Sequence, residues 1–285
     1  MIGLGHPDTS GIHTVDYFVS DDVELPTAVT TSYSEKVVLM SGMGTCFVDR
    51  MLDSATALQS PRTALLDRAK YIEKIGIPRS AHIYVIVQPL YTLHSVFDDC
   101  ITRIMMQDKL GYMIVLNPGN SWHSSHHTLF FSRLSGRLSD DAVKRILTFQ
   151  YLQTTDFIHK SIAAAHVLLD PFPGGSYHSS LYALSLGIPV ITYPSQQMIG
   201  RQCLSLYKRM GYMDLVVSSA LEFATLALTL AHKPKIRQNH VNYLMKYRSK
   251  LFDCSNVKKS WVAFFTAALE NSDDLRLRNK TRRGV

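Results

Sequence analysis

From about residue 80 onward, hydrophobic positions along the chain alternate between two kinds of pattern. Short, continuous apolar runs are typical of strands buried on both faces of a sheet. Between them, apolar residues recur at helical spacing, as in Phe97, Ile101 and Ile104. The runs lie at 83–87, 112–116, 146–149, 167–169, 189–193 and 215–217. This alternation predicts an α/β fold with a doubly wound parallel sheet and right-handed crossovers.

The segments between the runs carry helix start and stop signals. Ser95 precedes Asp98 and Asp99, which favours a helix N-terminus there, and Gly111 ends that helix. Further helices are expected at 126–134, 154–165, 198–210, 220–232, 235–251 and 257–269. The first 80 residues are less regular, with one strand expected at 17–20 and one helix at 62–75. That is too little for a second complete α/β domain.

Composition and cysteine usage narrow the class of protein. At 285 residues and 46% hydrophobic content, the chain is that of an ordinary globular protein. We expect no secretory leader and no membrane span, because no apolar run approaches roughly 20 residues. Cys46, Cys100, Cys203 and Cys254 form no Cys-x-x-Cys pair and are expected to be reduced thiols. These features favour the cytoplasm, with the nucleus as a second compartment.

The net charge of +7 is concentrated at the C-terminus. The last ten residues contain no acid and five bases, which are Arg276, Arg278, Lys280, Arg282 and Arg283. The remaining 275 residues therefore carry only +2, so the basic surface typical of a nucleic-acid-binding protein is not expected. The tail is interpreted as a disordered, solvated end, and docking to an acidic partner is the alternative.

The segment after the run at 167–169 is the best candidate for chemistry. Gly174 and Gly175 lie in a loop of small residues, and Ser179 and Ser180 follow at the start of the next helix. Backbone N–H groups and the helix dipole favour an anion there, and a diphosphate would fit. The same residues could also be an ordinary helix cap, and the loop chemistry alone leaves both interpretations open.

Other motifs give weaker signals. His123 and His127 stand four residues apart, but no nearby cysteine or carboxylate completes a tetrahedral metal site, so a structural loop is expected. The chain contains no Asp-x-Asp motif, so we expect no dedicated site for a divalent metal ion that would bind a diphosphate. Neither a Gly-x-Ser-x-Gly elbow nor a Walker lysine is present.

Collinear motifs over nearly the whole chain resemble the catalytic region of O-GlcNAc transferase and SPINDLY-like proteins, in glycosyltransferase family 41. The strongest is Leu169-Asp170-Pro171-Phe172-Pro173-Gly174-Gly175, and the first is Gly5-His6-Pro7-Asp8-Thr9-Ser10-Gly11. The others lie at 15–21, 32–36, 88–94, 97–98, 187–190, 200–201, 206–207 and 209–211.

The resemblance implies a GT-B fold. Its parts here would be a partial N-terminal lobe or connecting segment at 1–79, a Rossmann-like nucleotide-sugar-binding lobe at 80–271, and a basic disordered tail at 272–285. It implies transfer of a sugar, usually GlcNAc from UDP-GlcNAc, to Ser or Thr hydroxyls of proteins by an inverting mechanism. No metal or cofactor is implied, and the expected partners are the nucleotide sugar and a protein acceptor. The predicted binding residues are Gly174, Gly175, His178, Ser179, Ser180, Tyr182, Arg201, Gln88 and Thr92.

The chain also departs from the family pattern. Thr92 stands where the family has a lysine against the diphosphate, and Tyr182 stands where family members commonly have an acid for the ribose. A hydroxyl cannot replace a full positive charge that stabilises the leaving UDP. No residue is assigned as catalytic base. The alternative is a catalytically impaired member, or a fragment of a longer protein, that acts as a nucleotide-sugar or protein binding module.

Overall fold

The computed structural model describes residues 2–3, 8–23, 25–40, 44–47, 61–117, 124–150 and 155–282. The chain divides into two compact units. The smaller unit comprises 1–48 and 252–285, and the larger comprises 49–251. These bounds differ from those expected from the sequence, which divide the chain after residues 79 and 271. The sequence-based division stays a prediction. None of the helices in the described ranges is long and apolar enough to cross a membrane.

The larger unit contains a five-stranded parallel sheet in the order β6-β5-β4-β7-β8. Its strands are β4 (His82–Ile86), β5 (Gly111–Asn117), β6 (Ile146–Gln150), β7 (Val167–Asp170) and β8 (Val190–Thr192). The predicted α/β fold with a doubly wound parallel sheet is confirmed. The sixth expected strand is wrong: Val216 makes only an isolated bridge to Thr192. Ser219 caps the next helix two residues after Val217, so the chain turns away before a strand can form.

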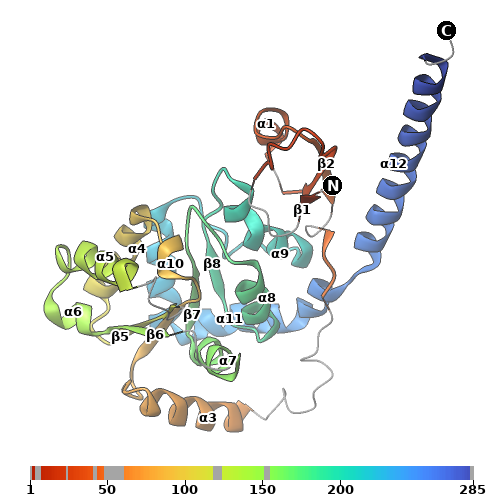
Figure 1. Cartoon of the computed structure of the whole chain (residues 1–285). Coiled ribbons are helices and arrows are strands. Elements are labelled where there is room, and N and C mark those ends of the chain that lie inside the picture. The colour runs from red at the N-terminus through yellow and green to blue at the C-terminus, as the bar shows by residue number, and fades with distance from the viewer. Residues whose placement is uncertain are drawn as a thin grey trace. The chain divides into compact units, whose positions relative to one another are not determined.

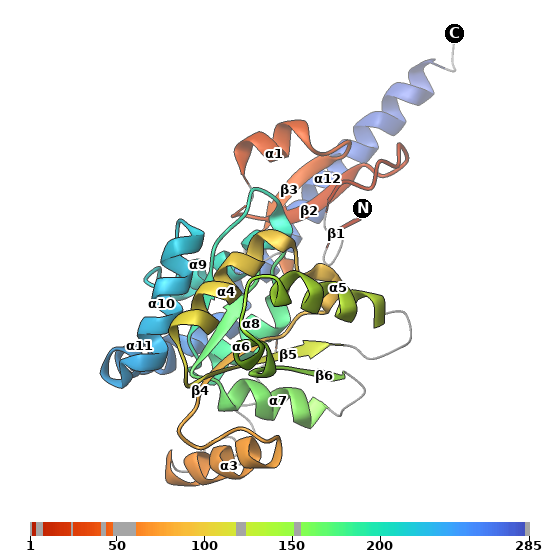
Figure 2. The ribbon, with the colours of Figure 1, turned by 90° about the vertical axis from the view of Figure 1, so that its left-hand side faces the viewer.

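Helices cover both faces of this sheet (Figures 1 and 2). On one face lie α4 (Asp98–Gln107) and α10 (Ala220–His232), and on the other α7 (Thr155–Ala164) and α8 (Tyr177–Ser185). The chain steps from β4 outward to β5 and from β7 outward to β8 in the opposite direction. Because both crossovers are right-handed, their helices lie on opposite faces.

The remaining helices of the larger unit are α3 (Pro61–Lys74), α5 (Ser124–Ser135), α6 (Asp140–Lys144), α9 (Gln202–Met210) and α11 (Pro234–Tyr247). Short 3-10 helices lie at η2 (Leu90–Thr92), η3 (Ser95–Phe97), η5 (Met198–Arg201) and η6 (Arg248–Phe252).

An aromatic cluster fixes the loop that follows β7. Phe172 packs edge to face against Phe97 of η3 and Phe223 of α10, with ring centroids 5.2 and 5.7 Å apart. Phe97 and Phe223 also contact each other at 5.5 Å, and all three rings are buried. Edge-to-face packing of this kind stabilises beyond the buried area alone. The loop therefore leaves the sheet in a direction set by the core.

The smaller unit contains a three-stranded parallel sheet of β1 (Ile2–Gly3), β2 (Tyr17–Asp21) and β3 (Lys36–Met40). The strand expected at 17–20 is confirmed, whereas β3 and α1 (Pro26–Thr31) were not anticipated. The unit also includes α12 (Ser255–Arg282). Residues 272–282, expected to be a disordered tail, are thus helical in the structure, since no glycine or proline interrupts α12 before Gly284.

Glu35 holds the Thr9-Ser10 segment of the smaller unit in place. Its buried carboxylate accepts hydrogen bonds from the Thr9 hydroxyl at 2.6 Å, from the Ser10 backbone N–H at 2.8 Å and from the Ser10 hydroxyl. Burial raises the pKa of Glu35, but these hydrogen bonds outweigh it and hold the pKa at about 2. The Thr9-Ser10 segment therefore binds a side chain of its own unit.

Two cysteines correct the expectation of four reduced thiols. Cys46 and Cys254, both in the smaller unit, form a disulfide with their Cα atoms 5.4 Å apart. They are 208 residues apart in sequence, so only the tertiary fold brings them together. Cys100 and Cys203 are free and buried, as expected.

Candidate functional site

The sheet of the larger unit has a switch point between β4 and β7. These strands are neighbours, but the chain continues from them toward opposite edges of the sheet. The two loops that follow these strands lie beyond their carboxyl ends, where doubly wound sheets bind ligands. Gln88 follows β4, and the loop at 171–176 follows β7. Both predicted segments lie at this point.

Gln88 joins the two sides of the switch point. Its Nε2 donates a hydrogen bond of 2.7 Å to the carbonyl oxygen of Gly175. The exposed Thr92 hydroxyl lies 2.7 Å from the Pro89 carbonyl oxygen and 3.3 Å from Gln88 Oε1. It therefore donates its hydrogen bond to an acceptor within its own turn. Three of the predicted site residues, Gln88, Thr92 and Gly175, are thus linked by direct contacts.

Asp170 is the anchor of the loop after β7. Its Oδ1 accepts from the Ser176 backbone N–H at 2.9 Å, and its Oδ2 accepts from the Thr192 hydroxyl of β8 at 2.8 Å. The side chain is only 2% exposed. Burial raises the pKa of Asp170 to about 7, although the hydrogen bonds from Thr192 and Ser176 lower it in part. About half of the Asp170 carboxyl groups are therefore neutral at pH 7, which reduces their repulsion toward a negatively charged ligand.

Two glycines make room for a second loop. A Cβ on Gly200 would lie 2.1 Å from the Pro173 carbonyl oxygen, and one on Gly175 would lie 2.7 Å from the Ile199 carbonyl oxygen. Neither contact is sterically possible, so the backbones at 173–175 and 199–200 can meet only with glycine at both positions. Gly174 differs, because a Cβ there meets nothing within 4 Å. Of the Gly-Gly pair, only Gly175 thus makes a close approach, and it makes it to this chain's own backbone.

The start of α8 presents its polar residues in different directions. Ser176 is the N-cap residue, and its side chain makes no capping hydrogen bond. His178 is exposed and Ser179 is half-buried. Ser180 is completely buried, and its side chain lies beside the buried thiol of Cys203. A ligand at this helix start would therefore meet His178 and Ser179 before Ser180.

Tyr182 and Arg201 have structural contacts of their own. The Tyr182 ring stacks on His159 of α7, with centroids 4.0 Å apart and planes inclined by 15°. The half-buried Arg201, at the end of η5, donates from Nη1 to the Ser195 carbonyl oxygen at 3.0 Å. Arg201 thus holds the loop that packs on Pro173, while Tyr182 contacts the neighbouring helix.

Sequence reasoning missed how much of this site depends on buried polar contacts. It identified the loop, the helix start and Gln88, but not the role of Asp170 and Thr192 in fixing them. An acid that directly follows a fully apolar strand was the available signal. The roles of the nine predicted residues in nucleotide-sugar binding stay a prediction. His123 lies outside the described residues, and His127 contacts Thr148 at 3.1 Å.

Known proteins resemble this chain in sequence and in fold. No protein-family profile matches it. It is 24% identical over 236 residues to the probable UDP-N-acetylglucosamine–peptide N-acetylglucosaminyltransferase SEC of Arabidopsis thaliana, covering 82% of this chain and 23% of that protein. This similarity supports the predicted resemblance to O-GlcNAc transferases. The chain spans less than a quarter of the length of this curated relative.

Solved structures show the fold. An O-GlcNAc transferase mutant of Thermobaculum terrenum matches with a TM-score of 0.67 and 20% identity, over 100% of this chain and 49% of that one. WaaG, a glycosyltransferase of lipopolysaccharide biosynthesis, matches with a TM-score of 0.59 and 13% identity, over 89% of this chain and 63% of that one. Anabaena HepE in complex with UDP and glucose matches with a TM-score of 0.54 and 11% identity, over 73% of this chain and 53% of that one. The predicted GT-B-type fold is thereby confirmed.

Asp170 should make stability depend on pH. Its pKa is raised in the folded state, so its contribution is fully present below about pH 4 and is lost as the pH rises through 7. The variant Asp170→Asn carries an amide that mimics the neutral acid, and it lacks this dependence. We expect the unfolding free energy of wild type relative to Asp170→Asn to fall by about 1–4 kcal/mol between pH 5 and pH 8. Urea denaturation at both pH values measures it, and a constant difference would contradict the assignment.

Gly200→Ala and Gly174→Ala form a matched pair. Alanine at 200 forces the Pro173 backbone away, with an expected loss of about 1–3 kcal/mol of stability. Alanine at 174 meets open space and should change stability by less than about 0.5 kcal/mol. Thermal unfolding of both variants distinguishes them. Equal melting temperatures would show that the contact between the two loops is not required.

Proposed function

We propose that this chain is the donor-binding part of a glycosyltransferase of the O-GlcNAc transferase type. In this proposal it binds UDP-GlcNAc, and the sugar passes to Ser or Thr hydroxyls of a protein acceptor with inversion at the anomeric carbon. The observation that carries the proposal is the switch point, where the 171–176 loop meets Gln88 beyond the carboxyl ends of β4 and β7. The similarity to SEC and the fold of the Thermobaculum enzyme support it.

The proposed mechanism uses the chain's own groups to hold the leaving diphosphate. The first turn of α8 faces it with backbone N–H groups and the positive end of the helix dipole. His178 and Ser179 add donors from the same turn, and Arg201 adds positive charge from the adjoining loop. Asp170 holds the loop in place, and because it is about half protonated near pH 7, it repels the phosphates less than a fully ionised carboxylate would. The negative charge that develops on UDP would thus be stabilised without a metal ion.

The second candidate function is a binding module without turnover. Thr92 favours it, because its hydroxyl is hydrogen-bonded to the Pro89 carbonyl and brings no positive charge to the diphosphate. Tyr182 favours it as well, since its ring is stacked on His159 and offers one hydroxyl where a carboxylate would bind two ribose hydroxyls. Such a module would still bind the nucleotide sugar at the same loop.

The compartment is part of the proposal. We place the protein in the cytoplasm and the nucleus. Disulfides are rare in those compartments, because glutathione and thioredoxin keep thiols reduced. The buried free thiols of Cys100 and Cys203 agree with these compartments, whereas the Cys46–Cys254 disulfide is an exception there.

Calorimetric titration of the full chain tests donor binding. We expect UDP and UDP-GlcNAc to bind in the micromolar range without added metal, and GDP-fucose to bind more weakly or not at all. Asp170→Ala should weaken UDP binding at least tenfold by releasing the loop, while Glu73→Ala, on the exposed surface of α3, should leave it unchanged. Absence of binding by all three nucleotides would refute the nucleotide-sugar site.

Thr92→Lys separates the two candidate functions. A lysine at this position places a charge against the expected diphosphate, which could stabilise the transition state by several kcal/mol. We expect UDP release from UDP-GlcNAc to rise at least tenfold in a coupled UDP assay, with Thr92→Met as the uncharged control of similar length. Unchanged release by a variant that still binds UDP would favour the binding module.

A further inference from the structure

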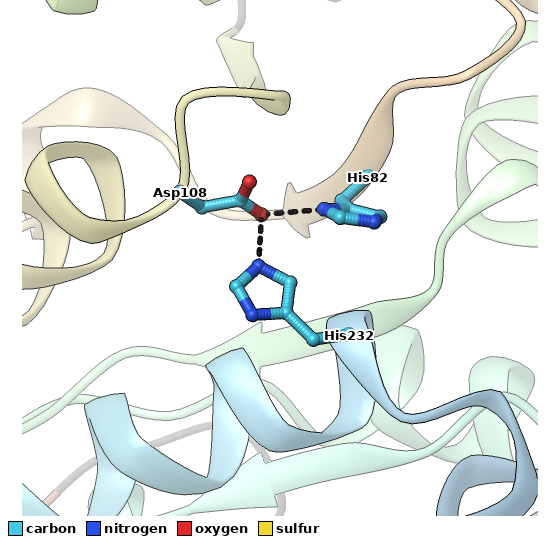
Figure 3. Close-up of side chains that lie close together, drawn as sticks. All are labelled: His82, Asp108 and His232. Atoms are coloured by element: carbon cyan, nitrogen blue, oxygen red, sulfur yellow. Dashed lines mark hydrogen bonds and ion pairs between the residues drawn. The ribbon is translucent and has the colours of Figure 1, made fainter.

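Two histidines and an aspartate lie close together at the start of β4 (Figure 3). His82 Nδ1 lies 2.8 Å from Asp108 Oδ2, and His232 Nε2 lies 3.1 Å from the same oxygen. One ligand atom of each residue lies within 4.8 Å of the other two. The residues come from three elements: His82 begins β4, Asp108 caps the C-terminus of α4, and His232 ends α10.

The carboxylate of Asp108 is held in one orientation by its surroundings. The Tyr84 hydroxyl donates to Oδ2 at 2.8 Å, and the Leu110 backbone N–H donates to Oδ1 at 3.1 Å. The buried Arg145 holds the backbone of this turn by donating to the carbonyl oxygens of Asp108 and Gly111, at 2.8 and 2.6 Å. Partners of this kind orient and tune the ligands of metal sites in proteins.

The cluster is separate from the proposed donor site. His82 starts β4 and Gln88 follows its end, so the two residues are six steps of mostly extended chain apart, or about 20 Å. The amino ends of parallel strands are away from the edge where doubly wound sheets bind nucleotides. Neither the donor nor its loops account for this arrangement.

We propose that His82, Asp108 and His232 bind a divalent transition-metal ion, with zinc as the best match. Imidazole nitrogens and one carboxylate oxygen form a donor set that suits zinc, whereas magnesium prefers oxygen ligands alone. Bonds of about 2.0–2.1 Å in a tetrahedral site separate the ligand atoms by roughly 3.3 Å. The observed separations from Asp108 are a few tenths of an ångström shorter, so small rotations of the two rings admit the ion.

The partial exposure of the two histidine side chains leaves room for a fourth ligand of the zinc ion. The side chain of His232 is 40% exposed and that of His82 is 23% exposed, while Asp108 is 2% exposed. A water molecule can complete the tetrahedron from the solvent side. His166 lies beside His82, with ring centroids 5.7 Å apart, but its Nδ1 accepts a hydrogen bond from the Ile83 backbone N–H and it forms a wall of the site. The ion would tie α10 to β4 and to the α4–β5 turn.

Calorimetric titration of the chelator-treated full chain with zinc chloride tests the site. We expect one zinc ion per chain with a dissociation constant in the micromolar range or below, and no binding of magnesium. His232→Ala should weaken zinc binding at least tenfold. His13→Ala removes an exposed histidine of the smaller unit and should leave it unchanged. Cobalt(II) in place of zinc should give visible absorption bands with wild type and His13→Ala only.

Each outcome decides for or against the proposal. The proposal would be overturned if no zinc binds when its concentration is 100 times that of the chain. Equal zinc binding by His232→Ala and His13→Ala would also overturn it. Circular dichroism shows whether His232→Ala folds; if it does not, His82→Ala takes its place with the same expected loss. Zinc should also raise the melting temperature of wild type by several degrees but not that of His232→Ala. UDP binding should be unaffected in both variants, so this test is independent of the proposed function.

Discussion

The buried carboxyl group of Asp170 is the constraint on which the candidate site depends. It ends the fully buried strand β7 and binds both the Ser176 backbone and the Thr192 hydroxyl, so one side chain joins β7, the loop and β8. Burying such a group is costly unless it is hydrogen-bonded or neutral, and Asp170 is hydrogen-bonded and about half protonated at pH 7. The loop is therefore pre-arranged in front of α8, and the Phe172 cluster fixes it from the side of the core.

Strand order gives the two ends of the sheet different chemistry. At the carboxyl ends, the switch point between β4 and β7 adjoins the loop that leads into the N-terminus of α8, and a helix N-terminus favours anions. At the amino ends, the start of β4 meets the ends of α4 and α10, and two imidazoles and a carboxylate face one another there. Such a group favours a cation. Both sites follow from one topology, which places strand starts and helix ends together.

Catalytic competence is a separate question from binding. In the proposed site, Gln88 is hydrogen-bonded to the loop after β7, whereas Thr92 and Tyr182 would place neutral groups where charge would assist the proposed reaction. Binding a nucleotide sugar uses many shared contacts, but transition-state stabilisation depends on charge aimed at the leaving group. A chain can therefore lose transition-state stabilisation while it keeps nucleotide-sugar binding.

The sequence by itself determined the α/β class, the five strands of the main sheet and the position of the loop after β7, because buried strands and helix caps leave local patterns. It also located Gln88, Gly175 and the start of α8. Only the tertiary structure decided the Cys46–Cys254 disulfide, the tight contact of Gly200 with Pro173, the burial of Ser180 and the cluster of His82, Asp108 and His232. These join residues far apart in the chain, and the local hydrophobic pattern contains no information about which distant side chains will meet.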